Sequence, residues 1–137
     1  MRLSLLSLAA MIIATAPVFA DGPAAGSVPN NLVGTQWRLT ALDGAPVPAD
    51  VTTTLTFSAE GINGNGGCNG YGGGVEATGT GITFTNVFST MMACPNLDQE
   101  QAFFAALDKT RTYAITDGTL QLRNADGNVV ADLASGK

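Results

Sequence analysis

The chain of 137 residues contains no histidine, only six basic residues and a single tryptophan. Without histidine there is no Ser-His-Asp triad, and the commonest nitrogen ligand for metals is missing as well. Because six basic residues face eleven acidic ones, the net charge is −5. A chain this acidic is repelled by nucleic acid and by anionic membrane surfaces, so neither is expected as a partner.

Cysteine is scarce too, with only Cys68 and Cys94 present. In an exported protein such a pair is expected to form a disulfide, and two buried free thiols are the alternative. Closing a loop of about 27 residues would stabilise the fold by roughly 3.5 kcal/mol in the chain-entropy description. A zinc site is not expected, since two thiolates without histidine leave tetrahedral coordination incomplete. No other metal and no cofactor is expected.

The N-terminus has the layout of a secretory signal. Arg2 precedes an apolar run over residues 3–16, and residues 17–20 (Pro-Val-Phe-Ala) place small residues where a signal peptidase reads them. We therefore predict that residues 1–20 are a signal peptide cleaved after Ala20. A transmembrane anchor, the competing interpretation, needs about 20 apolar residues, and this run is shorter. The expected location is periplasmic or secreted, with no membrane anchor after cleavage.

The remaining chain has the pattern of one small β-rich domain. Residues 21–30 are rich in Gly, Pro, Ala and Asn and predict a flexible leader, which places the domain at residues 31–134. Short strands are predicted where apolar residues alternate between turn residues: 35–42, 53–58, 82–88, 113–115, 120–122 and 129–133. In the third strand, the inward positions are Ile82 and Phe84, with Phe88 as a further candidate. Asp-Gly turns between strands of this length predict an antiparallel meander.

Residues 97–109 are predicted to form a helix, because the segment has no turn residue and no β-branched residue. Asn96 is placed to cap it. Glu100 falls in the middle of the apolar face, where its carboxylate must reach the edge or accept hydrogen bonds from a buried donor. The remaining members of that face are Leu97, Phe103, Phe104 and Leu107. The predicted fold is mainly β (α+β): a curved antiparallel sheet or partly open β-barrel with this helix packed on it.

The most unusual segment is residues 61–74, which contain eight glycines. A phosphate-binding loop is not supported, because neither G-x-G-x-x-G nor a glycine loop ending in Gly-Lys-Ser/Thr occurs there. The favoured interpretation is a strongly bent strand pair, in which glycine and asparagine supply bulges and positive φ beside another backbone.

Other catalytic groups are not apparent. No serine lies in a nucleophile elbow, and Trp37 is more typical of a core residue than of a ligand platform. The eleven acidic residues leave a converging carboxylate pair open, although no pair stands out.

Three groups of residues resemble the META domain, also called HslJ-like. They are Gly34-Thr35-x-Trp37-x-Leu39, then Gly67-Cys68-Asn69-x-Tyr71-x-Gly73, and then Thr90-Met91-Met92-Ala93-Cys94 followed by Glu100 and a helical Phe-Phe-x-x-Leu. The likeness extends from about Asn31 to Leu133. It implies a small β-rich domain with one helix, found in bacterial envelope proteins that are often lipid-anchored and linked to heat-shock response or antibiotic tolerance. It carries over no catalytic residue.

The resemblance also suggests how the unusual residues fit together. It places Cys68 in the glycine segment and Cys94 just before the helix, so that the disulfide would pin the segment beside the helix start. Glu100 would then accept hydrogen bonds from the backbone of that segment or from Trp37. The chain lacks the cysteine at the signal cut that a lipoprotein needs, which separates it from the lipid-anchored members of the family.

The leading functional hypothesis is a non-enzymatic, monomeric stress-response or binding module of the envelope, with an unknown protein or small molecule as its partner. Its contact surface would consist of the glycine segment, Tyr71 and residues 90–92, in which Met91 and Met92 are either adaptable contacts or core. A second hypothesis is an inhibitor or accessory protein that docks on an envelope enzyme through a long uncovered sheet edge. A hydrolase, which would need a concave pocket lined by two carboxylates, ranks last.

Overall fold

The structure is a computed structural model that describes residues 27–136. The predicted signal peptide, residues 1–20, and the first part of the predicted leader, residues 21–26, lie outside the described residues. Within the described part, no helix is long and apolar enough to span a membrane.

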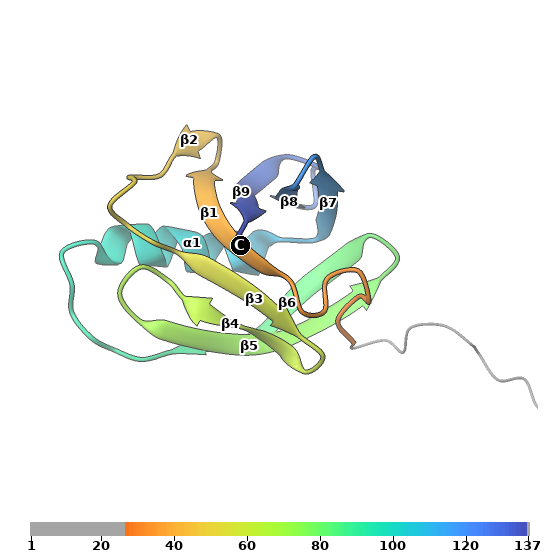
Figure 1. The fold of residues 1–137 in the computed structure, drawn as a ribbon, viewed down its shortest axis with the longest axis horizontal. Helices are drawn as coiled ribbons and strands as arrows, with labels where there is room; N and C mark the ends of the chain where they lie inside the picture. The colour runs from red at the N-terminus through yellow and green to blue at the C-terminus, as the bar shows by residue number, and fades with distance from the viewer. Residues whose placement is uncertain (1–26, 137) are drawn as a thin grey trace, which may run out of the picture.

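Residues 27–136 form nine strands and one helix (Figure 1). In chain order they are β1 (Gln36–Leu42), β2 (Ala45–Pro46), β3 (Thr54–Ser58), β4 (Gly61–Asn65), β5 (Gly70–Thr78), β6 (Gly81–Ser89), α1 (Leu97–Lys109), β7 (Thr112–Thr116), β8 (Thr119–Arg123) and β9 (Val129–Ser135). All neighbouring strands pair antiparallel. The predicted helix has the observed bounds, and every predicted strand overlaps an observed one.

The sheet closes on itself through its first and last strands. β1 pairs with β3 on one side and with β9 on the other, from Trp37 opposite Ser135 to Leu42 opposite Ala131. The ring is weakest between β6 and β7, where Gly81 opposite Thr112 is the one register pair. α1 connects these two strands and contacts β6, β8, β9 and β1 (Figure 1). The predicted partly open barrel with a packed helix is therefore confirmed.

The core follows from the alternation of the strands. Trp37 and Leu39 of β1 and Leu55 and Phe57 of β3 point inward and are buried, while the residues between them are more exposed. The Asp-Gly turns bend as expected: Asp117 and Gly118 have φ values of 50° and 75°, the two positive values that a tight type I′ hairpin needs.

At Phe88 the alternation prediction was wrong. Gly72 lies opposite Phe88 and Gly74 lies opposite Thr85, so two residues of β6 face one residue of β5. This bulge, with Asn86 at a φ of 51°, reverses the side on which later side chains emerge. As a result Phe88 is 68% exposed, whereas Phe84 is buried.

The folded unit also begins earlier than the sequence indicates. Val28, assigned above to a flexible leader, is only 6% exposed and belongs to the same core as Leu32. The backbone turns at this point, since the amides of Leu32 and Val33 donate to the carbonyl of Pro29. Residues 28–30 are therefore part of the domain.

The helix packs through Glu100, Phe103, Ala106 and Leu107, which are all buried. Leu97 and Phe104 of the predicted apolar face are only half-buried. Asn96 occupies the N-cap position of α1 as predicted, but its side chain makes no cap hydrogen bond with the helix. Its amide instead donates to the carbonyl oxygen of Gly67 over 2.9 Å, which ties the start of the helix to the glycine segment.

Candidate functional site

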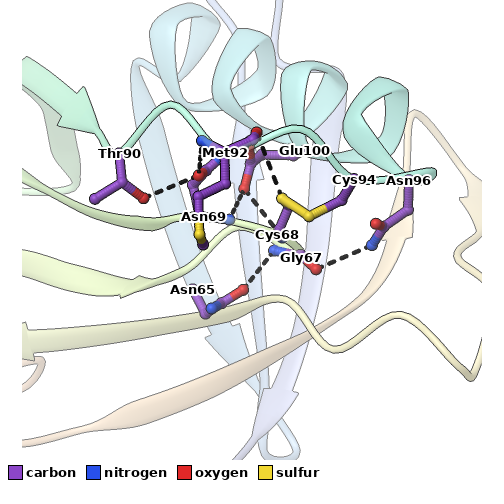
Figure 2. The surroundings of a disulfide bond; sticks show 9 residues. All are labelled: Asn65, Gly67, Cys68, Asn69, Thr90, Met92, Cys94, Asn96 and Glu100. Atoms are coloured by element: carbon purple, nitrogen blue, oxygen red, sulfur yellow. Dashed lines mark hydrogen bonds between the residues drawn. A yellow bond between two sulfur atoms is a disulfide. The ribbon is translucent and has the colours of Figure 1, made fainter.

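Two connections meet at one end of the barrel (Figure 2). The glycine loop, residues 66–69, joins β4 to β5, and the methionine segment, residues 90–96, joins β6 to α1. A disulfide between Cys68 and Cys94 links them, with their Cα atoms 5.9 Å apart. The predicted disulfide is therefore confirmed, and no free cysteine occurs in the part of the chain that the structure describes.

Glu100 reaches from the first turn of α1 into the glycine loop. Its side chain is 2% exposed. The amides of Cys68 and Asn69 donate to Oε1 over 3.1 and 2.6 Å, and Asn69 Nδ2 donates to Oε2 over 2.7 Å. The loop backbone is thus the partner of this carboxylate. Trp37, the other donor suggested for it, gives its indole N–H to Thr35 Oγ1 over 2.8 Å.

These contacts keep the Glu100 carboxylate ionised. Burial raises the pKa of the group, but the hydrogen bonds from the side chain and backbone of Asn69 and from the backbone of Cys68 outweigh burial, so the pKa lies below its usual value. A carboxylate whose two oxygens accept three hydrogen bonds is held in one orientation and joins helix to loop.

Asn69 holds the first part of the methionine segment through hydrogen bonds to Thr90 and Met92 (Figure 2). Its Oδ1 accepts from the amide of Met92 over 2.7 Å and from Thr90 Oγ1 over 2.9 Å. Its Nδ2 also donates to the carbonyl of Met92 over 3.3 Å. The side chain of Asn69 therefore pairs with both backbone groups of Met92 while its other contacts secure Glu100.

The glycines of the loop are required by this close packing. A Cβ on Gly66 would lie 2.7 Å from Glu100 Cγ and 2.9 Å from the ring of Phe104. Gly67 has a φ of 123°, a conformation that side chains disfavour, and its amide donates to Asn65 Oδ1 over 2.8 Å. Gly66 thus makes room for side chains of α1, and Gly67 has the positive φ expected in the glycine segment.

Tyr71, predicted as part of the contact surface, is buried and only 5% exposed. Its ring is buried against Phe103 and Phe104, with centroids 5.7 and 5.3 Å away. Its hydroxyl donates to the carbonyl of Thr54 over 2.6 Å, and burial raises the pKa of the phenol well above its usual value. Tyr71 is a core residue that anchors β5.

Three large apolar side chains lie in the open within residues 88–92. Phe88 is 68%, Met91 92% and Met92 58% exposed. We call these three residues the apolar patch. Met91 and Met92 belong to the contact surface predicted from the sequence, whereas Phe88 was only a further candidate for the inward face of its strand. The outward direction of Phe88 follows from its register opposite Gly72 beyond the bulge, and that register is a property of the folded sheet.

Phe88 borders three surface hollows of about 280, 430 and 310 Å³. Asp108 lines the first and Glu60 the third, and no lysine or arginine lines any of them. The hollows beside Phe88 therefore combine apolar with uncharged polar residues, and two of the three contain a single carboxylate.

A larger hollow of about 750 Å³ lies over the outer side of β1 and β3 and contains no acidic residue. Across the five hollows described for residues 27–136, none is lined by more than one carboxylate. Among the same residues, no three His, Cys, Asp or Glu side chains gather in a way that could hold a metal ion. At this site, hydrogen bonds and a disulfide fix the glycine loop and the methionine segment to each other.

Comparison with known proteins places the chain among small β-rich domains. The family model described as META domain matches residues 30–136. An NMR structure of a protein from Burkholderia xenovorans is similar with a TM-score of 0.66 at 23% identity, covering 89% of this chain and 99% of that one. A second NMR structure has a TM-score of 0.64 at 20% identity, covering 79% and 94%. No curated protein sequence matches the chain.

Proposed function

The chain belongs to the META domain family, and we propose that it is a non-enzymatic binding module of the cell envelope that holds an apolar segment of a partner protein. The observation that carries the proposal is the exposure of Phe88, Met91 and Met92 on a segment whose backbone is fixed. These three large apolar side chains are exposed within five consecutive residues, whereas a folded surface usually carries such side chains singly, and this favours an interaction surface.

The fixed backbone favours binding for an energetic reason. Association loses affinity when a flexible segment has to become ordered. Here Thr90 and Met92 are already held by Asn69, and Cys94 is held by the disulfide. Only side-chain rotamers remain to be ordered, and methionine side chains adapt readily to different apolar shapes.

The chemistry of the partner follows from the border of the patch. Glu60 and Asp108 line hollows beside Phe88, and the whole chain carries a net charge of −5. An apolar segment flanked by basic residues would combine apolar burial with favourable electrostatic steering. We therefore assign the partner to this class.

The N-terminal signal pattern and the disulfide support an exported location. We extend the proposal to a periplasmic or secreted protein that acts in the stress response with which the family is associated.

The two other hypotheses have less support. The sheet-edge hypothesis needs a long uncovered strand, but β1 and β9 pair with each other, and α1 lies against β6 beside the weak β6–β7 pairing. The hydrolase hypothesis needs two carboxylates in one hollow, and each described hollow has at most one.

The test is crosslinking capture from an envelope extract with three forms of the protein. The wild-type protein and the control Ile115→Ser should capture the same partner, because Ile115 is exposed on β7, outside the patch. The triple variant Phe88→Ser, Met91→Ser, Met92→Ser should lose that partner while keeping the melting temperature of the wild-type protein, since it alters only exposed side chains. Capture that is equal for all three forms would refute the proposal.

A further inference from the structure

The two methionines of the patch are unusual for their chemistry as well as their exposure. Met91 and Met92 are the only methionines among residues 27–136, and their side chains are 92% and 58% exposed. The other sulfur atoms of this part belong to Cys68 and Cys94, which are joined as a disulfide and have no thiolate to react. Among the sulfur atoms of residues 27–136, the thioethers of Met91 and Met92 are therefore the ones most readily oxidised.

We propose that Met91 and Met92 form an oxidation site at which peroxides convert the apolar patch into a polar surface and weaken partner binding. This inference rests on the proposed function, because it describes how the same patch is regulated. The sulfur lone pair attacks one oxygen of the peroxide, the O–O bond breaks and an S–O bond forms. With hydrogen peroxide, the departing hydroxide becomes water by taking the proton carried by the transferred oxygen, directly or through solvent. The thioether is thereby oxidised to a sulfoxide and the peroxide is reduced to water.

Oxidation at this place leaves the fold intact. Met92 is held through its backbone, whose amide and carbonyl both pair with Asn69. The side chain that reacts makes no contribution to the core of the barrel. Sulfoxide formation in a core would disrupt packing, whereas here it changes only what the surface presents. The modification therefore acts on binding and not on stability.

The exposed fractions predict an order of reaction. Met91 should react first, at a rate close to that of methionine in a short unstructured peptide, and Met92 should follow because it is partly covered. Hydrogen peroxide treatment followed by peptide mass spectrometry measures both rates. Protection of both residues by an order of magnitude or more against the free peptide would overturn the proposal.

A second measurement follows the surface itself. The probe is an immobilised phenyl resin, which retains proteins that expose apolar surface. Peroxide should reduce the retention of the wild-type protein without lowering its melting temperature. The matched variant Met91→Leu, Met92→Leu keeps apolar side chains but has no thioether in the patch, so its retention should be unaffected by peroxide. Equal losses in both proteins, or no loss in the wild-type protein after both sulfoxides have formed, would overturn the proposal.

Capture from the extract separates this inference from the proposed function. Peroxide should reduce partner capture by the wild-type protein and leave capture by the leucine variant unchanged. If serine substitutions in the patch leave capture intact while peroxide still lowers resin retention, the proposed function fails and the oxidation site stands. If serine substitutions abolish capture but the oxidised wild-type protein captures normally, the regulation fails and the proposed function stands.

Discussion

Burial disfavours the ionised form of the Glu100 carboxylate, and three hydrogen bonds from neutral N–H groups stabilise it. The loop supplies two backbone donors, from Cys68 and Asn69, and one side-chain donor from Asn69. Asn69 in turn uses its amide oxygen and nitrogen to hold Met92. These two side chains therefore couple helix, loop and methionine segment, and the loss of either leaves buried partners without a hydrogen bond.

The first residue-scale prediction concerns Glu100→Gln. The new amide nitrogen would face Asn69 Nδ2, so that two donors meet or a loop amide loses its acceptor. We expect the free energy of unfolding to fall by about 2 kcal/mol and the melting temperature by roughly 10 °C. Calorimetry and urea titration measure the change, and Glu60→Gln at an exposed turn is the control. An unchanged melting temperature would contradict the role given to Glu100.

The same carboxylate predicts a pH dependence. Because its pKa is lowered in the folded protein from the usual value of 4.5, the unfolded chain binds more protons near and below that pH. Its contribution to stability is present above about pH 4.5 and is lost as the pH falls through the folded pKa. The difference in stability between the wild-type protein and Glu100→Gln should therefore shrink on acidification below pH 4.5. A difference that is constant down to pH 3, on the order of one unit below the usual pKa, would contradict the assignment.

At the scale of elements, the glycines let β4 and β5 bend against β3. A Cβ on Gly64 would lie 2.3 Å from the carbonyl oxygen of Thr54, which is backbone and cannot move aside easily. Gly70 lies opposite Asn65 in the same strand pair, yet a Cβ there would meet only Gly64 O at 4.0 Å. Glycine is therefore required at some positions of this segment and incidental at others.

This contrast predicts different outcomes for the same substitution. Gly64→Ala should destabilise the protein by about 2 kcal/mol, because the strand pair must shift to remove the clash. Gly70→Ala should change stability by no more than about 0.5 kcal/mol, since its Cβ has room. Urea denaturation of both variants measures the difference. Equal stabilities would show that β4 does not pack on Thr54 as described.

At the scale of the whole molecule, β9 completes the ring. It pairs with β1 and with β8, and it contributes Val130, Ala131 and Leu133 to the core. Burying one large aliphatic side chain contributes about 1.5–3 kcal/mol, a large part of the stability of a small domain. Removing this strand would also leave β1 with an open edge.

A chain that ends at Asn128 should therefore not fold. We expect it to lose the dispersed amide resonances of a folded protein in an NMR spectrum, while a chain that ends at Ser135 keeps them. A dispersed spectrum from the shorter chain would show that the remaining strands are stable without closure.

Much of the fold was predictable because its signals are local. Alternating side chains mark β1 and β3, Asp-Gly pairs mark the hairpin turns, and the run of helix formers over residues 97–109 marks α1 with its observed bounds. The disulfide was predictable because a chain with only two cysteines has one way to pair them. Membership in the META family was indicated by short motifs whose order along the chain is visible without a structure.

The sequence alone determined where strands, turns and helix occur, since those depend on residues within a few positions of one another. Only the tertiary structure decided which aromatic residue is inside. The bulge at Asn86 turns Phe88 outward, and Tyr71 is buried against the rings of Phe103 and Phe104. It also decided the role of Asn69, whose partners Glu100 and Met92 are more than 20 positions away. Side-chain direction after a bulge and hydrogen bonds between distant segments depend on how the strands pair, and that pairing is a property of the closed sheet.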